Sequence, residues 1–381
     1  MSDFKELRGK KFLFAAGHFD YFSGAERQAV YFAEYLVRQI AADVKFIGWG
    51  GNGRFADEIR RAGATPVVFP LNPSARRLEF QLTLLSLARF IRFNLKPDYL
   101  LPYVAMHCRI MGAVWPWSGT PFCWWNQRDE GRDISGSRLE NRLLKHLPVV
   151  ISNSWEGKEF LTKRFRLAND RVQVVNNGVI LPPICNDKSW RASLGIDTDA
   201  FVITMLANLT RYKDHLTLLR AFAEVVKAFP RRNLHLVFAG SHYDETSAIK
   251  SLAWDLGLYG RLHLPGSICD TDSLLRSTDL VVHSSSTEGC PNGVLEAMAH
   301  GLPVLGTNIS GLRQALGLSM IDSCLSPIED WNDLAAKISL RIEERRLCEQ
   351  EGKANRDRIR CEFSIESMAQ NSLNAIVRGT P

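Results

Sequence analysis

Short apolar runs alternate with amphipathic helical patterns along the whole chain, and this alternation restricts the fold more than any other feature. Each run is only a few residues long and almost entirely apolar, as in buried strands of a parallel sheet. The first series covers residues 11–16, 44–48, 66–69, 99–104, 122–125, 149–152 and 172–175. The second series covers residues 201–207, 234–240, 262–265, 280–283, 303–305 and 320–321. Strict alternation of strands and helices predicts an α/β fold with doubly wound parallel sheets.

A segment rich in turn-forming residues separates the two series. It reads NNGVILPPICND at residues 176–187, where a glycine and a pair of prolines interrupt regular structure. We therefore predict a first Rossmann-like domain over residues 1–183 and a second over 184–363, with a helix at about 364–378 that packs back on the first. Ligands of open α/β sheets bind beyond the carboxyl ends of the strands, so we expect the site in a central cleft between the two domains.

Composition excludes several classes of protein. The chain has 381 residues, of which 45% are hydrophobic and 23% charged, so it resembles an ordinary globular protein rather than a fibrous or disordered one. No apolar run approaches a bilayer span or a signal-peptide core, which predicts a cytoplasmic protein. The eight cysteines form no CxxC pair and the histidines are dispersed, so we expect neither a disulfide framework nor a metal site.

The most informative segment is HSSSTEGCPNGVLEAMAHGLPVLGTNISG, residues 283–311. A strand ends in a loop of hydroxyl residues, and Glu288 precedes a glycine and a proline. A helix is then expected to start near Asn292, with Asn as a good N-cap. Its first backbone N–H groups would form an anion site, and they belong to Gly293, Val294 and Leu295. Glu296 lies inside this apolar helix, where its carboxylate needs a hydrogen-bonding partner such as a sugar hydroxyl.

Glu288 and Glu296, with seven residues between them and AMAHGLPV after them, resemble the E-x7-E signature of the retaining family 4 glycosyltransferases. Three further segments match the pattern of that family in the same order. They are FSGAERQ at residues 22–28, VVNNGV at 174–179 and ANLTRYKDHLTLLRAF at 207–222. The resemblance covers nearly the whole chain and implies the two-domain GT-B architecture, with the donor bound by the second domain and the acceptor by the first.

The resemblance also implies roles for individual residues. Lys213 would neutralise the donor phosphates and stabilise the departing nucleotide diphosphate, so it is a catalytic candidate together with Glu288. Glu288 and the backbone N–H groups after it would contact the donor sugar and pyrophosphate, and Glu296 would hold the ribose hydroxyls. Gly24, in the first of the matching loops, would let backbone N–H groups approach the phosphates.

The sequence departs from the family pattern in two places that concern the site. Asn208 stands where the family usually has arginine, five residues before the lysine, and Arg211 is the candidate to replace that charge. After Pro121, where many members have a histidine near the donor sugar, the sequence offers other candidates for sugar or acceptor contacts. These are Asn126, Gln127, Arg128 and Asp129. Two histidines are weaker candidates, because an isolated histidine is more often packed or capping; they are His18 and His107.

The resemblance implies a retaining hexosyltransferase that uses a nucleotide diphosphate sugar, either a UDP-sugar or a GDP-sugar, to build a cell-surface glycan, polysaccharide or glycolipid. The absence of metal-ligand motifs from the sequence predicts that it is metal-independent and needs no cofactor. A nucleotide-sugar epimerase or a sugar phosphorylase is an alternative, because one fold supports several reactions. A basic nucleic-acid-binding module is a weaker alternative, since no aromatic RNA-binding motif accompanies the basic residues, and we expect no nucleic-acid partner.

The net charge of +6 is unevenly distributed along the chain. Residues 1–183 contain 26 Lys and Arg against 17 Asp and Glu, whereas the remainder contains 21 against 24. Basic residues flank or lie on two helices with apolar stripes, at Arg76, Arg77, Arg89, Arg92 and Lys96 and at Arg138, Arg142 and Lys145. Such helices rest on anionic lipid in peripheral membrane proteins, which would suit a lipid-linked acceptor. Ordinary solvated charge explains them nearly as well.

Overall fold

The computed structural model describes residues 4–72, 76–184, 189–268 and 270–379. Contacts along the chain divide it into two compact units. Unit 1 comprises Met1–Gly178 together with Ile365–Pro381, and unit 2 comprises Val179–Ser364. Among the described helices, none combines the length and the apolar character needed to cross a bilayer.

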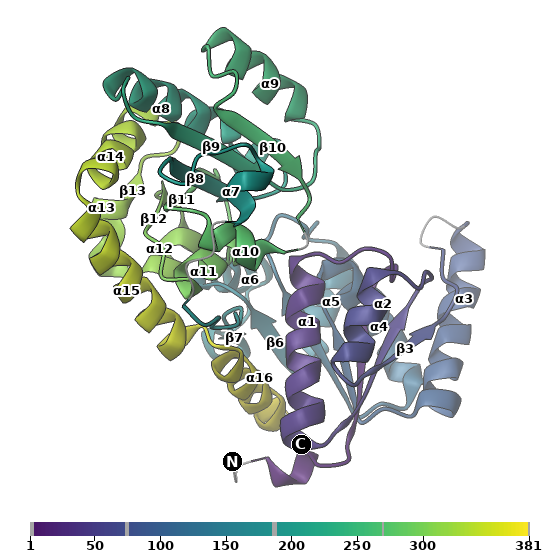
Figure 1. The fold of residues 1–381 in the computed structure, drawn as a ribbon. Helices are drawn as coiled ribbons and strands as arrows, with labels where there is room; N and C mark the ends of the chain where they lie inside the picture. The colour runs from purple at the N-terminus through teal and green to yellow at the C-terminus, as the bar shows by residue number, and fades with distance from the viewer. Residues whose placement is uncertain (1–3, 73–75, 185–188, 269, 380–381) are drawn as a thin grey trace. The chain divides into compact units, whose positions relative to one another are not determined.

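Unit 1, which runs from purple to teal in Figure 1 and includes the yellow α16, is built on a parallel sheet of seven strands in the order β3-β2-β1-β4-β5-β6-β7. The strands are β1 (Lys11–Ala15), β2 (Asp43–Gly48), β3 (Thr65–Val68), β4 (Tyr99–Pro102), β5 (Phe122–Gln127), β6 (Val149–Ser152) and β7 (Val172–Val174). The helices are α1 (Gly24–Tyr35), α2 (Arg54–Arg61), α3 (Arg77–Phe90), α4 (Ala105–Ser118), α5 (Arg138–His146), α6 (Trp155–Phe165) and α16 (Ile365–Gly379), with short turns η1 (Lys5–Leu7), η2 (Leu36–Ile40), η3 (Ile91–Leu95) and η4 (Asn169–Arg171).

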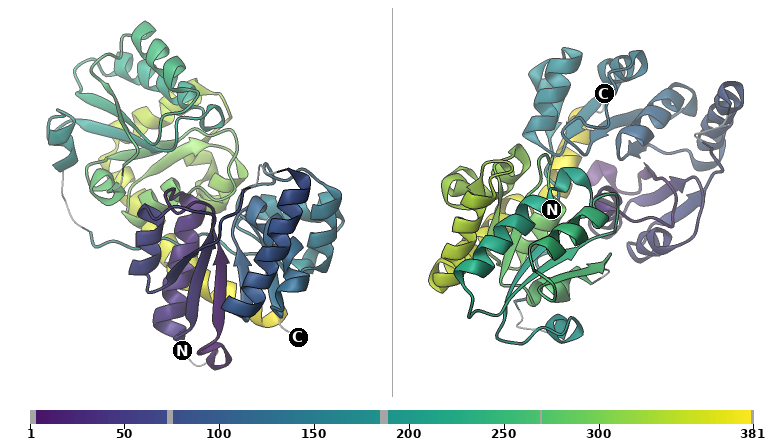
Figure 2. Two further views of the ribbon diagram at one scale, coloured as in Figure 1. Left: turned by 90° about the vertical axis from the view of Figure 1, so that its right-hand side faces the viewer. Right: turned by 90° about the horizontal axis from the view of Figure 1, so that it is seen from above.

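Helices cover both faces of this sheet because successive strand residues point to opposite faces. In β1, Phe12 and Phe14 pack with residues of α1, α2 and α16, whereas Leu13 and Ala15 pack with residues of α3, α4 and α5. Figure 2 shows the two groups of helices on either side of the strands. Burial on both faces explains why each strand is a continuous apolar run rather than an alternating one.

The last helix of the chain, α16, completes the core of unit 1. Met368, Ala369 and Leu373 are buried against this core beside α1. Gly178 lies against the start of α16, where a Cβ atom would come within 2.9 Å of the Cα atom of Ile365. The buried side chain of Gln28 on α1 holds Gly178 by accepting from its N–H (2.7 Å) and donating to its carbonyl (2.9 Å). This close backbone contact therefore fixes the position of Gly178 against the start of α16.

Unit 2 has a parallel sheet of six strands in the order β10-β9-β8-β11-β12-β13. The strands are β8 (Phe201–Leu206), β9 (Leu234–Ala239), β10 (Leu262–Gly266), β11 (Leu280–His283), β12 (Val304–Thr307) and β13 (Leu325–Ser326). The helices are α7 (Ser189–Ser193), α8 (His215–Ala228), α9 (Thr246–Asp255), α10 (Thr271–Arg276), α11 (Asn292–Ala299), α12 (Ser310–Leu316), α13 (Ile321–Cys324), α14 (Trp331–Glu343) and α15 (Arg345–Glu362), with turns η5 (Arg211–Lys213) and η6 (Leu318–Met320).

The two parallel sheets with helices on both faces confirm the predicted fold class, but one predicted strand is wrong. Residues 320 and 321 lie in the turn η6 and in α13, and the strand β13 follows them. Met320 and Ile321 are only partly buried, whereas Leu325 is buried and pairs with Gly306 of β12. Two adjacent apolar residues satisfy a helical turn at the edge of a core as well as a strand, so the apolar pair alone did not distinguish them.

Candidate functional site

The clearest candidate site lies in unit 2, beyond the carboxyl ends of β8 and β11. These strands are neighbours in the sheet, so the loops that follow them meet. The N–H of Ser286, after β11, donates to the carbonyl of Tyr212, after β8, at 2.8 Å. The hydroxyl of Ser284 donates to the carbonyl of Asp214 at 2.8 Å. These bonds bring the segment around Lys213 against the segment that contains Glu288.

Glu288 is a buried carboxylate, with a side chain only 10% exposed. Its Oε1 atom forms an ion pair with the ammonium of Lys213. The same atom lies 3.0 Å from Nε2 of His283 and 3.2 Å from the hydroxyl of Ser285. A buried carboxylate requires such partners, because removing its charge from water is costly. The two predicted catalytic residues, Glu288 and Lys213, are therefore in direct contact.

His283 and Ser285 are members of this cluster that the sequence analysis did not identify. His283 is the last residue of β11 and is completely buried. Burial, followed by the nearby charge of Lys213, holds the pKa of His283 well below its usual range. The imidazole is therefore neutral near pH 7, and in the tautomer protonated at Nε2 it donates to Glu288. A histidine at the end of an apolar strand, next to three serines, is the signal that could have identified it.

The start of α11 differs from the prediction. Pro291, not Asn292, is the N-cap of the helix. The carbonyl of Pro291 accepts from the N–H groups of Val294 (3.1 Å) and Leu295 (3.2 Å), so these two amides already have partners inside the helix. Proline is suited to this place because its fixed φ needs no further ordering. Of the three backbone N–H groups predicted to form an anion site, only that of Gly293 takes no part in these two hydrogen bonds.

Glycine is required at position 293 by a close approach of α11 to β8. A Cβ atom at this position would lie 2.6 Å from the carbonyl oxygen of Leu206, the last residue of β8. The absence of a side chain therefore allows the first turn of α11 to rest on the carboxyl end of that strand. Glu296, one turn further along α11, is partly buried.

Asn208 and Arg211, the two residues in the unusual part of the lysine segment, have different environments. The side-chain oxygen of Asn208 accepts from the N–H of Ser241 at 3.1 Å, which ties the loop after β8 to the loop after β9. Arg211 is exposed and lines a cavity of about 1060 Å³ with Tyr212 and Ser286. Asn208 thus has a bond that organises the loop, whereas Arg211 lines this cavity two residues before Lys213.

A second cluster of polar residues lies in unit 1, at the carboxyl ends of β4 to β7. The guanidinium of Arg128 bonds to Asn126 (3.4 Å) and to Asn177, and it stacks over the ring of Tyr103 at 5.4 Å. The carbonyl of Arg128 accepts from the side chain of Asn153 at 2.9 Å. Nδ2 of Asn126 and Oδ1 of Asn153 are buried without a protein partner, which is typical of ligand sites and of sites for ordered water.

The other two predicted contacts on this segment bond mainly to each other. The side chain of Gln127 accepts from the indole N–H of Trp125 at 3.2 Å and donates to Asp129. Asp129 also accepts from the N–H of Gly131 at 2.6 Å. Burial, with the nearby acids Asp133 and Glu130, raises the pKa of Asp129. Gln127 and Asp129 therefore hold the loop, whereas Asn126 and Arg128 belong to the cluster. The sequence analysis missed three members of this cluster, although each lies within three residues of the end of a strand. They are Tyr103, Asn153 and Asn177.

His107 and His18 are held in different ways in unit 1. Nδ1 of His107 lies 2.7 Å from the carbonyl of Tyr103, whereas its Nε2 is buried without a partner. Val104, just before α4, has φ of +63°, a strained conformation for a β-branched residue and one that occurs often at functional sites. His18 is about half exposed and lies 3.2 Å from Asp20.

Gly24 is the first residue of α1. Ser23 is the N-cap, and the carboxylate of Glu26 accepts from the N–H of Ser23 at 3.2 Å, which completes a capping box. The predicted glycine loop therefore leads directly into a helix N-terminus, where backbone N–H groups attract anions. Among the described residues, no group of three or more His, Cys, Asp or Glu side chains is arranged to hold a metal ion.

Two family models match the chain. The model described as Glycosyltransferase Family 4 matches residues 22–181, and the one described as Glycosyl transferases group 1 matches residues 186–358. A D-inositol 3-phosphate glycosyltransferase of Saccharomonospora viridis is 29% identical over 219 residues, which cover 54% of this chain and 51% of that protein. The Escherichia coli UDP-Gal:alpha-D-GlcNAc-diphosphoundecaprenol alpha-1,3-galactosyltransferase is 31% identical over 164 residues, 41% of each chain. The chain thus spans about half the length of these curated relatives or less.

A solved structure matches almost the entire chain in fold. The Anabaena protein HepE, crystallised with UDP and glucose, superimposes with a TM-score of 0.83 at 18% sequence identity. The match covers 97% of this chain and 99% of HepE. It supports the predicted fold of two Rossmann-like units.

The buried His215, next to Lys213, predicts a specific dependence of stability on pH. Burial, followed by the charge of Lys213, lowers the pKa of His215 to about 4 from an ordinary value of 6.5. Below pH 6.5 the unfolded chain therefore binds a proton that the folded chain does not, and the free energy of unfolding falls until about pH 4. The variant His215→Phe keeps a ring against Phe238 but cannot bind the proton. We expect it to reduce the fall in the free energy of unfolding between pH 6.5 and pH 4 by up to about 3 kcal/mol, as measured by urea unfolding at several pH values.

The matched control is the exposed His242, also in unit 2. His242→Phe should leave the dependence on pH as in the wild type. An unchanged loss of stability between pH 6.5 and 4 in His215→Phe would contradict the assignment of this proton to His215.

Proposed function

Because the chain belongs to the GT-B glycosyltransferases of the family 4 type, we propose that it transfers a hexosyl unit from a nucleotide diphosphate sugar to an acceptor hydroxyl, with retention at the anomeric carbon. The observation that carries the proposal is the contact between Lys213 and Glu288 at the carboxyl ends of β8 and β11. Ligands of open α/β sheets bind at this edge.

Lys213 supplies the positive charge that this reaction needs, without a metal. When the bond between the anomeric carbon and the diphosphate breaks, the leaving oxygen takes the electron pair and gains negative charge. An ammonium held beside that oxygen stabilises the charge as it develops. The acceptor oxygen bonds to the anomeric carbon on the face from which the diphosphate leaves, and its proton passes to the leaving diphosphate.

Glu288 has two tasks in this proposal. Without donor, it balances the charge of Lys213 in a buried place. With donor, the phosphates compete for the ammonium, and the carboxylate then accepts hydrogen bonds from sugar hydroxyls. His283 and Ser285 keep Oε1 of Glu288 in position through both states, because their own bonds to it do not involve Lys213. Glu296, one turn beyond Gly293 on α11, would hold the ribose hydroxyls of the donor.

The relatives favour a UDP-sugar donor and an acceptor in glycan, polysaccharide or glycolipid synthesis. HepE was crystallised with UDP and glucose, and the name of the Escherichia coli relative includes UDP-Gal and a diphosphoundecaprenol-linked sugar. In unit 1, Asn126, Arg128 and Asn153 are the residues we propose for contact with the acceptor or the donor sugar. The buried side-chain amide atoms without protein partners, Nδ2 of Asn126 and Oδ1 of Asn153, suit a ligand rich in hydroxyl groups.

Removing either member of the central pair should abolish transfer. We expect Lys213→Ala and Glu288→Gln each to lower kcat/KM by at least about 100-fold, the usual effect of losing one group that stabilises a transition state. The measurement is UDP release from UDP-glucose and UDP-galactose in the presence of a lipid-linked acceptor. Lys250→Ala, which removes an exposed lysine on α9, is the matched control and should behave as the wild type.

Near-normal turnover in both variants would contradict the mechanism. The same incubation without acceptor distinguishes the alternative reaction: conversion of the donor into another nucleotide sugar would identify an epimerase, whereas a transferase releases UDP only slowly by hydrolysis.

We further propose that unit 1 rests on an anionic membrane surface through α3 and η3. Four apolar side chains on this stretch are exposed, by 49% to 69%, namely Leu78, Leu82, Leu85 and Phe93. Exposed basic residues accompany them at Arg89, Arg92 and Lys96. Apolar side chains that enter the lipid boundary, next to cations that face the headgroups, are typical of interfacial helices. Each such cation contributes about 1 kcal/mol near an anionic surface.

Sedimentation with lipid vesicles tests this surface. We expect the chain to sediment with vesicles that contain phosphatidylglycerol and much less with pure phosphatidylcholine. The double variant Leu82→Ser/Phe93→Ser should reduce binding about tenfold, because two apolar anchors are lost. Tyr259→Ser, at a side chain that is 85% exposed in unit 2, should bind as the wild type. Equal, negligible binding to both kinds of vesicle would end the membrane proposal while leaving the transferase proposal intact.

A further inference from the structure

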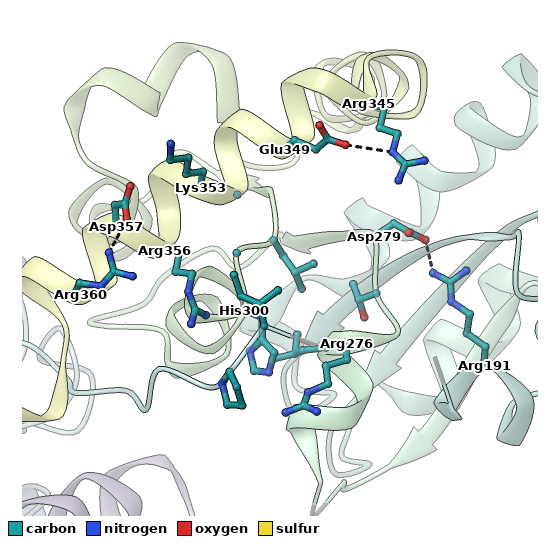
Figure 3. Close-up of a pocket in the computed structure, with 17 residues that line it drawn as sticks. Arg191, Arg276, Asp279, His300, Arg345, Glu349, Lys353, Arg356, Asp357 and Arg360 are labelled. Atoms are coloured by element: carbon teal, nitrogen blue, oxygen red, sulfur yellow. Dashed lines mark hydrogen bonds and ion pairs between the residues drawn. The ribbon is translucent and has the colours of Figure 1, made fainter. Parts of the chain in front are cut away.

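Unit 2 contains another cavity, at the amino-terminal edge of its sheet (Figure 3). It has a volume of about 980 Å³. Asp279, just before β11, and Leu302, just before β12, line it. Glu288 follows β11, so this cavity lies at the opposite end of the strands from the candidate donor site. Helix α11 connects the two ends, since Gly293 lies in its first turn and His300, directly after it, lines the cavity.

One face of α15 forms a wall of the cavity. Its lining residues recur every three or four positions, as on one side of a helix, and they are Arg345, Glu349, Gly352, Lys353, Arg356, Asp357 and Arg360. Figure 3 labels all of these except Gly352 along α15, with Arg191, Arg276, Asp279 and His300 on the other side.

The lining is basic although the surrounding part of the chain is not. Six of the seventeen described lining residues are Arg or Lys and three are Asp or Glu. Residues 184–381 as a whole contain 21 Lys and Arg against 24 Asp and Glu. The positive charge is thus concentrated at this cavity, and a cavity lined by one sign of charge attracts ligands of the opposite sign.

Some of these cations have structural bonds and others are available to a ligand. Arg191 pairs with Asp279 at 2.7 Å, and Arg356 donates to the carbonyls of Ala299 and Pro182. By contrast, the exposed Lys353 forms no ion pair among the described residues. Arg360 is 60% exposed, and its one ion pair within the described parts of the chain is with its helix neighbour Asp357, an interaction weak enough for a ligand to replace.

The two available cations, Lys353 and Arg360, have long side chains that extend from the same helix. Lys353 and Arg360 are seven residues apart on α15, which is two turns or about 10 Å. Arg356 lies between them on the same face. Across the cavity, Arg276 pairs with Asp272 through Nη2 at 2.6 Å, and its Nε is buried without a hydrogen-bond partner. Guanidinium and ammonium groups are the common protein ligands of phosphate.

The remaining lining indicates what the phosphate is attached to. Among the described lining residues the only aromatic ring is that of His300, which is bonded to Asp272 at 2.7 Å and to the carbonyl of Glu296 at 2.8 Å. The side chain of His300 is only 11% exposed, so it offers little ring surface for stacking on a nucleobase. We propose that this cavity binds a phosphate ester that lacks a nucleobase, with the phosphate held by Lys353 and Arg360.

Calorimetric titration of the full chain with glycerol 3-phosphate tests the proposal, with glycerol as the neutral comparison. We expect saturable binding of the phosphate ester and none of glycerol. The double variant Lys353→Gln/Arg360→Gln should bind at least about tenfold more weakly, since it removes two charge-assisted contacts from exposed positions. Binding should be unchanged in Lys213→Ala, because Lys213 lies at the other edge of the sheet.

The matched control is Lys227→Gln/Lys250→Gln, which removes the same charge from exposed positions of unit 2 outside the cavity. This variant should bind as the wild type. The proposal is overturned by an absence of saturable binding to the wild type, by equal affinity in Lys353→Gln/Arg360→Gln, or by loss of binding in Lys213→Ala, which would assign the ligand to the donor site.

Discussion

The charge of Glu288 is the constraint on which the candidate site of unit 2 depends. A carboxylate that is nearly enclosed by protein must receive hydrogen bonds or an opposite charge, and here Oε1 has Lys213, His283 and Ser285 around it. Each partner comes from a place that the sheet determines. Lys213 follows β8, His283 ends β11, and the hydroxyl of Ser285 lies two residues further on. A change in the register of β8 against β11 would leave the carboxylate buried without compensation.

Close approaches of backbone to backbone hold this arrangement in place. The first turn of α11 lies on the end of β8 at Gly293. On the other side, a Cβ atom at Gly311 would lie 2.5 Å from the carbonyl oxygen of Glu288. Asp214, with φ of +52°, turns the chain after Lys213 and caps α8 by accepting from the N–H of Thr217 at 3.2 Å. These contacts leave little freedom for the loops, so the site is organised before a ligand binds, as effective electrostatic stabilisation requires.

Much of the fold, and the strand ends at which the candidate site lies, could be predicted from the sequence because the strands are buried on both faces. Their apolar runs and the alternation with helices predicted two parallel sheets, and the glutamate and lysine segments predicted which strand ends matter. The errors arose where the residue types are compatible with more than one local structure or contact. Asn292 is a good N-cap by residue type, but the carbonyl of Pro291 accepts the first bonds of α11. His283 was missed because its importance depends on a contact with Glu288 that only the folded sheet creates.

In the proposed mechanism, the segments around Lys213 and Glu288 bind the diphosphate of the donor. Hydrogen–deuterium exchange of the full chain with and without UDP measures this directly, because amides that bond to phosphate or lie under it exchange more slowly. The account predicts slower exchange in residues 207–214 and 284–296 when UDP is added. Saturating UDP with no change in either segment, or with protection confined to other parts of unit 2, would contradict it.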